Sequence, residues 1–268
     1  MMYHMDTLKN ILLSMDPVKE LRALIATGEL VNLEPTLAYL LMPIPAGYHH
    51  KDNLEHSIRV LGNAIEREVN GPDLILRTAA LFHDIGKPAS RQFGPKGSVT
   101  FTNHDVIGAK MVKNLLPSHG YSKQEVAQIA TLVHMHMRSH TFKTGWSESA
   151  VRRMIVDVGS ADQLERLIVI FYSDATTKID TTREGIHRNV GLLTDALNEV
   201  KKKDARARLR PALNGNEVAE ILNLTPGIEL GNAMKLLNQD QNIFLKREEA
   251  IALLKETFPV MTDANVST

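Results

Sequence analysis

The segment from Leu74 to Phe82 is apolar on nearly all sides and leads into the dipeptide His83-Asp84. A helix with this pattern is typical of the buried centre of a domain. Gly86 and Pro88 follow, and we expect them to end the helix. An ionised carboxylate at the edge of a core is costly unless a partner neutralises it. A divalent cation is the compensation that also binds a neighbouring histidine, so this dipeptide suggests a metal site.

Most of the remaining sequence has the hydrophobic period of helices, with capping residues at the starts and glycine near the ends. Arg91–Thr102 contains Gly94-Pro95-Lys96-Gly97 and is the only segment typical of strands, so we expect a loop or small hairpin there. The fold class is therefore predicted to be all-α. The expected helices cover approximately residues 17–28, 34–41, 52–65, 74–82, 104–116, 122–138, 147–159, 160–172, 181–210, 217–222, 226–241 and 247–257.

Composition restricts the chemistry. The chain has 268 residues, 43% of them hydrophobic, which is enough for one long domain or for a domain with an appendage. It has no cysteine, so any metal must be bound by histidine and carboxylate. Lys+Arg and Asp+Glu balance at 31 each, which argues against a chain that mainly coats nucleic acid. The apolar runs are short and no signal peptide is evident, so we expect a cytoplasmic protein without a membrane partner.

A set of histidines and aspartates from five predicted helices could bind one or two divalent cations. His56 lies well off the apolar stripe of its helix and Asp174 lies at the edge of an apolar face, so core packing explains neither position well. Each histidine taken alone is more simply a surface or hydrogen-bonded residue, and His134 is the alternative to His136. The predicted metal ligands are His56, His83, Asp84, His104, His136 and Asp174. The histidines interpreted as structural or solvated are His49, His50, His119, His134, His140 and His187.

These motifs carry a resemblance to a known family. The order His56, His83-Asp84, Asp174, with Gly86-Lys87 after the dipeptide, resembles the HD superfamily of metal-dependent phosphohydrolases. Over Val18–Pro259 the chain is more closely similar to the HD-containing tail of bacterial tRNA nucleotidyltransferases, the CCA-adding enzymes. The segments that carry this similarity are Asp52–Val60 (DNLEHSIRV), Ala79–Pro88 (AALFHDIGKP), Asn103–Met111 (NHDVIGAKM), Leu132–Arg138 (LVHMHMR) and Leu213–Pro226 (LNGNEVAEILNLTP).

The resemblance implies an HD-domain helical bundle with a small C-terminal helical appendage. We expect an N-terminal helical segment over residues 1–47, a metal-dependent phosphohydrolase domain over 48–200, a C-terminal helical subdomain over 201–261 and a disordered tail over 262–268. The head of the CCA-adding enzymes is not recognisable, because neither its glycine-rich loop nor its paired catalytic aspartates are found. We therefore expect that this chain does not add CCA. No dinucleotide-binding or P-loop motif is present either.

The resemblance also implies a phosphodiesterase or phosphatase that acts on nucleotides, with 2′,3′-cyclic phosphates or small phosphate esters favoured. It implies one or two divalent ions, Mn, Co, Ni, Fe, Zn or Mg, and the imidazole-rich ligand set favours the transition ions over Ca. Asp84 would bridge two ions, and Asp84 and Lys87 would be the catalytic residues. Lys87, Arg91 and Arg138 would bind the phosphate, although solvated cations explain the two arginines equally well.

Two other functions fit the same sequence. One is hydrolysis of deoxynucleotides or signalling nucleotides, as in other branches of the HD superfamily. The other is an RNA-binding module that kept the fold without the chemistry. RNA is a candidate partner of the basic run Lys201–Arg210, which is as readily explained as a solvated helix end.

Overall fold

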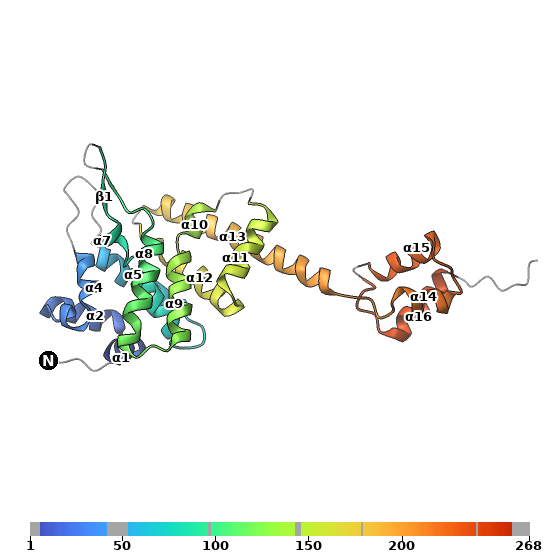
Figure 1. Ribbon diagram of the computed structural model, residues 1–268, viewed down its shortest axis with the longest axis horizontal. Coiled ribbons are helices and arrows are strands. Elements are labelled where there is room, and N and C mark those ends of the chain that lie inside the picture. Colours follow the sequence, from blue (N-terminus) through green and yellow to red (C-terminus); the bar gives the residue numbers. More distant parts are fainter. Residues whose placement is uncertain are drawn as a thin grey trace, which may run out of the picture. The chain divides into compact units, whose positions relative to one another are not determined.

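The computed structural model describes residues 6–41, 53–95, 98–142, 146–177, 179–239 and 241–258. Outside these residues lie His49, His50, the first residue of the helix predicted over 52–65 and the tail predicted over 262–268. The chain divides into two compact units, Met1–Val200 and Lys201–Thr268, and each is described by itself (Figure 1).

The first unit begins with short helices. The sequence pattern does not predict α1 (Thr7–Leu13), which buries Leu8, Ile11 and Leu12. α2 (Pro17–Thr27) starts as predicted after Asp16, whose carboxylate accepts a hydrogen bond from the backbone of Lys19, and it ends at Gly28. The segment predicted as a helix over residues 34–41 is helical from Pro35 to Leu41, with its last three residues in a 3₁₀ turn. The elements here are α3 (Leu30–Leu33), α4 (Pro35–Ala38) and the 3₁₀ helix η1 (Tyr39–Leu41).

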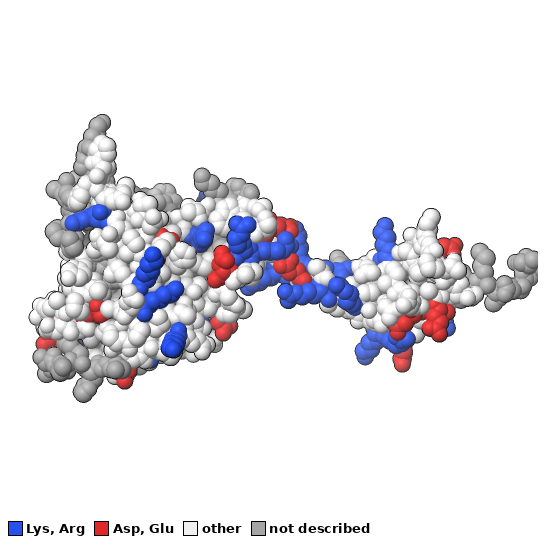
Figure 2. All heavy atoms as spheres, viewed as in Figure 1, with Lys and Arg blue, Asp and Glu red and all other residues white. Residues whose placement is uncertain are grey.

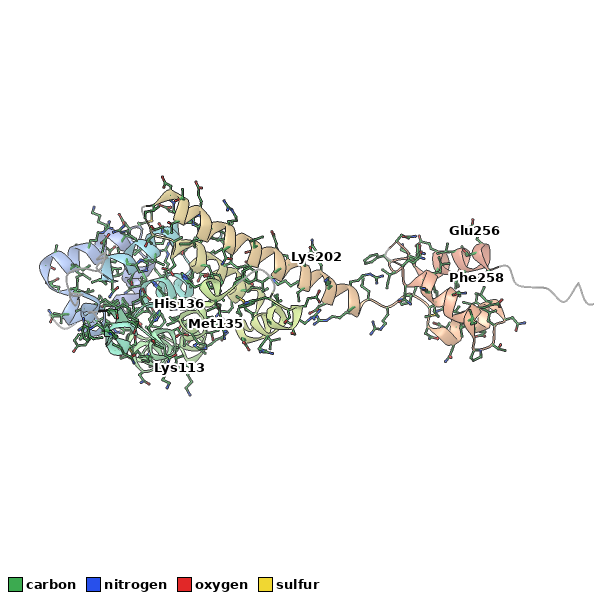
Figure 3. The ribbon with its side chains drawn as sticks, turned by 90° about the horizontal axis from the view of Figure 1, so that it is seen from above. Lys113, Met135, His136, Lys202, Glu256 and Phe258 are labelled. Atoms are coloured by element: carbon green, nitrogen blue, oxygen red, sulfur yellow. The ribbon has the colours of Figure 1, made fainter. Side chains whose placement is uncertain are left out.

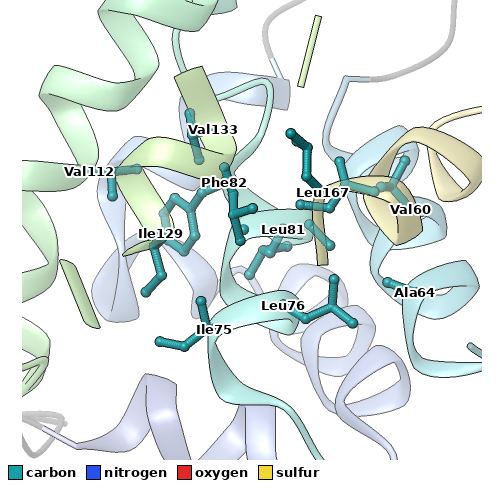
Figure 4. Close-up of a cluster of buried hydrophobic side chains, with 14 of the residues drawn as sticks. Val60, Ala64, Ile75, Leu76, Leu81, Phe82, Val112, Ile129, Val133 and Leu167 are labelled. Carbon is teal, nitrogen blue, oxygen red and sulfur yellow. The ribbon is translucent and has the colours of Figure 1, made fainter. Parts of the chain in front are cut away.

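The apolar helix α6 (Leu74–Phe82) lies at the centre of this unit, as its sequence predicts. It packs against α1, α5 (Asn53–Ile65), α9 (Lys123–Met135) and α12 (Ala161–Ser173). Figure 4 shows Leu81 and Phe82 among side chains from these helices, and both are fully buried. The end of α6 is therefore inside the unit, and the next two residues, His83 and Asp84, are only 0% and 2% exposed.

One charged side chain, Arg77, is buried within α6. Its guanidinium donates hydrogen bonds to both carboxylate oxygens of Glu68, at 2.7 and 2.6 Å. A third bond reaches the backbone oxygen of Leu12 at 2.7 Å. The buried charge is thus fully paired, and the third bond attaches the end of α1 to the central helix.

Near the predicted metal site, one residue expected to end a helix and the end of one other helix differ from the prediction. Pro88 does not end a helix, because α6 already ends at Phe82 and Pro88 lies in the first turn of α7 (Lys87–Ser90), a favoured position for proline. α9 ends at Met135 and does not continue to Arg138, which instead begins α10 (Arg138–Thr141).

The rest of the unit follows the predicted order. The segment predicted as a loop or small hairpin contains two short strands, β1 (Gln92–Phe93) and β2 (Val99–Thr100), which pair antiparallel. α8 (His104–Leu115) lies beside α9, and the 3₁₀ helix η3 (Leu116–His119) follows it. α11 (Glu148–Val158) is capped by Ser147, and α12 is capped by Ser160. α13 (Asp180–Arg208) begins one residue before the predicted Thr181 and buries Val190, Leu193, Leu197 and Val200.

The second unit has a small core of its own. Its helices are α14 (Gly215–Leu222), α15 (Ile228–Leu237) and α16 (Arg247–Thr257). α15 ends before the predicted Gln241, with Asn238 as its cap. The buried residues are Leu213, Val218, Leu222, Ala233, Leu237, Ala250 and Leu254. The predicted all-α class is confirmed, and no helix within the described residues combines the length and apolarity needed to cross a membrane.

A buried carboxylate that is hydrogen-bonded to a histidine, outside the predicted site, contributes to the stability of the first unit. Glu34 is 3% exposed, and its Oε2 lies 2.7 Å from Nε2 of His119. Its Oε1 accepts bonds from the backbone and hydroxyl of Thr36 at 2.8 and 2.6 Å. Burial alone would raise the pKa of Glu34, but these hydrogen bonds lower it below its usual value of 4.5. Ionised Glu34 therefore stabilises the fold above pH 4.5, and this stabilisation is lost as the pH falls through the lowered pKa.

We expect Glu34→Gln to lower the free energy of unfolding at pH 7 by about 1–2 kcal/mol, because the hydrogen bonds lose their charge. The difference from the wild type should shrink below pH 4.5, where the native carboxyl also gains a proton. Urea denaturation at several pH values measures both effects. Glu184→Gln, an exposed glutamate of α13, is the matched control. A pH-independent difference would contradict this account of the pair.

Candidate metal centre

Five helices bring the predicted metal ligands together in the first unit. His56 lies within α5, and His104 is the first residue of α8. The other ligands stand at helix ends, because His83, His136 and Asp174 each follow the last residue of α6, α9 and α12. Figure 3 labels His136 beside Met135, and His136 is 1% exposed. All six side chains except His83 line one cavity of about 480 Å³.

The first group of ligand atoms consists of His56, His83 and Asp174. Nε2 of His56 lies 3.0 Å from Oδ1 of Asp174 and 3.2 Å from Nε2 of His83. Oδ2 of Asp84 faces the same group, at 3.4 Å from Nε2 of His56 and 3.2 Å from Nε2 of His83.

The second group consists of Asp84, His104 and His136. Here the other carboxylate oxygen, Oδ1 of Asp84, lies 3.3 Å from Nε2 of His104 and 3.7 Å from Nε2 of His136. The two Nε2 atoms are 3.1 Å apart. Asp84 thus lies between the two groups and presents one oxygen to each.

The orientation of the rings tests whether a cation fits. Nδ1 of His104 and of His136 faces a backbone oxygen, that of Phe101 at 2.8 Å and that of Val133 at 2.6 Å. A carbonyl only accepts, so both Nδ1 atoms carry the hydrogen, and in the neutral rings both Nε2 atoms present lone pairs. Two lone pairs facing each other at 3.1 Å require a positive charge between them, which either a proton or a metal cation supplies. Nδ1 of His83 faces the oxygen of Ala80 at 2.8 Å in the same manner.

The charge distribution agrees with this requirement. Burial would raise the pKa of Asp84, but His83 and Lys87 hold it well below its usual range. Burial opposes protonation of His83, but Asp84 and Asp174 outweigh it and raise the pKa of His83 to about 10. Burial, assisted by His83, lowers the pKa of His136 to about 4. In the metal-free protein a proton on His83 thus compensates the negative charge of Asp84 and Asp174, as a bound cation would.

A close contact between two backbones aligns the groups. A Cβ atom on Gly86 would lie 2.1 Å from the backbone oxygen of His104 and 2.6 Å from the backbone nitrogen of Gly108. The turn after Asp84 therefore rests directly on the first turns of α8. The absence of a side chain at residue 86 is what allows His104 to approach Asp84.

Of the predicted phosphate-binding residues, only Lys87 lies at this cavity, and its Nζ is 2.5 Å from Oδ2 of Asp84. Arg91 instead lies over the ring of Phe93, at 5.2 Å from the centroid. Arg138 lines a separate cavity with Lys110 and Lys113, near α8 and α9, where basic side chains gather on the surface (Figure 2). The structure thus does not bring Arg91 and Arg138 to the site.

Two residues that the sequence did not single out do lie there. His140, interpreted as structural or solvated, lines the cavity with Nε2 at 3.4 Å from Oδ2 of Asp174. Thr176 also lines the cavity, and its hydroxyl lies 2.9 Å from Nδ1 of His56. His134, the alternative to His136, faces Asp105 at 3.6 Å outside the cluster. The position of His140 four residues after His136, on the next short helix, was the one available signal.

Known proteins define the class to which this arrangement belongs. Residues 53–178 match the HD domain and include all six clustered side chains. The first unit therefore contains an HD domain, the domain of a superfamily of metal-dependent phosphohydrolases.

Two curated proteins are similar to most of the chain. It is 32% identical over 237 residues to a CC-adding tRNA nucleotidyltransferase of Thermus thermophilus. This match covers 88% of the present chain and 51% of the Thermus protein. It is 28% identical over 233 residues to an A-adding tRNA nucleotidyltransferase of Deinococcus radiodurans, covering 87% of this chain and 52% of that protein. The chain spans about half the length of these relatives.

We expect metal binding to release a proton. With its pKa raised to about 10, His83 is protonated near pH 7 in the metal-free protein, whereas a metal ligand must be neutral. Affinity should therefore fall as the pH is lowered, by up to about tenfold per pH unit. Calorimetric titration with Mn²⁺ in two buffers of different ionisation enthalpy measures the released protons. Equal heats in both buffers would contradict the expectation.

Proposed function

We propose that the first unit is a metal-dependent phosphohydrolase that binds one or two divalent cations, chosen from Mn, Co, Ni, Fe, Zn and Mg. His56, His83 and Asp174 would hold one ion, and His104 and His136 the other. The observation that carries the proposal is Asp84, whose two oxygens face the two histidine groups while Lys87 lies beside it. Four imidazoles favour the transition ions over Ca.

The bound metal would supply a water of lowered pKa and an electrophilic contact for a phosphoryl oxygen. Lys87 would neutralise charge on the phosphate from the wall of the cavity, where Asp84 positions its Nζ. His140 would act as the proton donor, since its hydrogen bond with Asp174 raises its pKa and favours the imidazolium. The P–O bond to the leaving oxygen would break as the oxygen of water bonds to phosphorus. The proton of His140 would pass to the leaving oxygen, and the proton lost by the water would restore the imidazolium of His140.

We further propose that the substrates are 2′,3′-cyclic phosphates or small phosphate esters of nucleotides. The cavity of about 480 Å³ has the size of a small-molecule pocket. In a cyclic phosphate the leaving oxygen stays attached to the product, so a confined pocket need not release a second fragment. The two similar proteins are named as tRNA nucleotidyltransferases, which supports RNA as the source of such a nucleotide.

A comparison of hydrolysis rates tests this proposal. The substrates are 2′,3′-cyclic AMP, 2′-AMP, a deoxynucleoside triphosphate and an RNA oligomer, each measured with the six metal ions named above in turn. We expect the cyclic phosphate to be preferred, with a transition ion as the best metal. Preference for the triphosphate would replace the proposal by a nucleotide-pool hydrolase. Binding of RNA without hydrolysis of any substrate would replace it by a non-catalytic RNA-binding module.

We expect Lys87→Ala to lower turnover on the order of 10²-fold, because one charge that contacts the phosphoryl group is lost. Metal content should be retained, since the change leaves the six ligands in place. Steady-state kinetics and elemental analysis of the purified variant measure the two quantities. Lys110→Ala is the matched control, since Lys110 lies at the separate cavity. Unchanged kinetics would remove Lys87 from the phosphate site.

A further inference from the structure

A second cavity adjoins the metal centre. It measures about 420 Å³ and shares Thr176 and Thr177 with the cavity of the metal centre. Its other lining residues come from α5, from the turn that follows α5, from the end of α12 and from α13. Thr176 and Thr177 therefore lie between the two cavities.

The second cavity is rich in positive charge. Arg59, Arg67 and Arg183 line it, against one acidic residue, Glu66. Among the described residues no carboxylate pairs with Arg67, whose guanidinium donates only to the backbone oxygen of Asn63 at 2.7 Å. Arg183 pairs with Asp180, an exposed residue of the same helix turn. These cations are available to an anionic group at little desolvation cost, because they are partly exposed.

Within the part of the chain that the structure describes, Arg59 makes only a long ion pair, with Glu55. Its Nε lies 3.4 Å from Oε1 of Glu55, while that carboxylate is bonded more closely, at 2.7 Å, by Arg22. The cavity also offers ring surface, because Tyr172 and His187 both line it and pack edge to face at 5.3 Å between centroids. Cationic groups beside aromatic rings are the combination that binds single-stranded nucleic acid, through phosphate contacts and base stacking.

We propose that this cavity binds the phosphate on the 5′ side of the nucleotide that occupies the metal centre. Resting on the proposed function, this inference narrows the substrate to the 3′ end of an RNA chain with a terminal 2′,3′-cyclic phosphate. A nucleoside 2′,3′-cyclic phosphate without a 5′-phosphate would fill only the metal cavity. A nucleoside triphosphate has its phosphates joined directly to one another, whereas in the proposed substrate a ribose lies between the two phosphates, as Thr176 and Thr177 lie between the two cavities.

The test compares kcat/KM for three cyclic phosphates under one metal. The probes are adenosine 2′,3′-cyclic phosphate, the same nucleotide with a 5′-phosphate, and the dinucleotide ApA ending in a 2′,3′-cyclic phosphate. We expect the second and third to exceed the first by about tenfold or more, the size of a charge-assisted hydrogen bond. The advantage should fall as salt concentration rises.

Variants connect this advantage to the second cavity. Arg67→Ala and Arg183→Ala should each lower the advantage by about threefold, and the double variant should remove most of it. Hydrolysis of adenosine 2′,3′-cyclic phosphate without the 5′-phosphate should stay at the wild-type rate. Arg188→Ala, an exposed arginine of α13 outside the cavity, is the matched control. Unchanged mononucleotide hydrolysis also shows that the variants are folded.

The possible failures are distinct. If no cyclic phosphate is hydrolysed by the wild type, the proposed function fails. If the mononucleotide is hydrolysed but the 5′-phosphate gives no advantage, the second phosphate site is wrong and the proposed function stands. An advantage that survives the double variant would likewise overturn the assignment to this cavity.

Discussion

Asp84→Ala is expected to empty the metal centre and to lower phosphohydrolase activity by about 10³-fold or more. Both oxygens of this carboxylate face histidine Nε2 atoms, Oδ2 at 3.2 Å from His83 and Oδ1 at 3.3 Å from His104. Its removal takes a negative ligand from both groups at once, whereas any other single change affects one group. Loss of the bound ion removes both the activated water and the contact to the phosphoryl group.

The chain offers a matched control for this variant. His104-Asp105 is a second dipeptide of the same two residue types, but Asp105 faces His134 at 3.6 Å outside the cluster. Asp105→Ala should therefore keep metal and activity. Elemental analysis, kinetics and circular dichroism of both variants measure the outcome. Metal content that is unchanged in Asp84→Ala would contradict the bridging position, and equal loss in both variants would indicate a general effect on the fold.

The sequence predicts the position of the centre better than its details. Four of the six predicted ligands stand out in the sequence, because His56 and Asp174 depart from the apolar faces of their helices and His83-Asp84 directly follows an apolar helix. Asp84 and Asp174 are the clearest examples, since a carboxylate at the buried end of an apolar helix needs a partner. In the structure both lie in one cluster with four histidines.

The choice between His134 and His136 depends on where α9 ends. Two positions differ by about 200° around a helix, so only one of these rings can face the cluster. Because the helix stops at Met135, His136 lies in the turn beyond it and reaches the centre. The same early end places Arg138 on α10, where it lines a cavity other than that of the metal centre.

Long-range contacts account for the remaining differences. The sequence marks Arg77 only as an exception within an apolar helix, whereas its partners are Glu68 and the backbone of Leu12, far apart in the chain. The spacing of His140 from His136 does not identify a partner, and its place beside Asp174 follows from the packing of distant helices. Hydrophobic period and caps describe local structure, and they contain no information on such pairings.

The role of Gly86 also differs from the prediction. Its sequence context indicates a helix end, whereas in the structure it allows close packing of two backbones. Its φ of −78° is open to any residue, so backbone conformation does not require glycine here. The requirement is space, since an added Cβ would meet two backbone atoms of α8, at 2.1 and 2.6 Å. Neither atom can move without moving α8 itself, whereas a flexible side chain could turn away.

We therefore expect Gly86→Ala to force α8 away from the turn that carries Asp84. The cost should be about 1–3 kcal/mol in free energy of unfolding, typical of overpacking, and the second ligand group should open because His104 is the first residue of α8. Gly185→Ala is the matched control: the added methyl group in α13 would meet nothing within 4 Å, and alanine favours a helix. Thermal unfolding with and without Mn²⁺ measures both effects.

In Gly86→Ala the melting temperature should fall and the stabilisation by metal should shrink, since a displaced His104 weakens binding of the metal to the folded state. A lower melting temperature with full metal stabilisation would mean that the contact supports the fold alone, and that the alignment of Asp84 with His104 depends on other contacts.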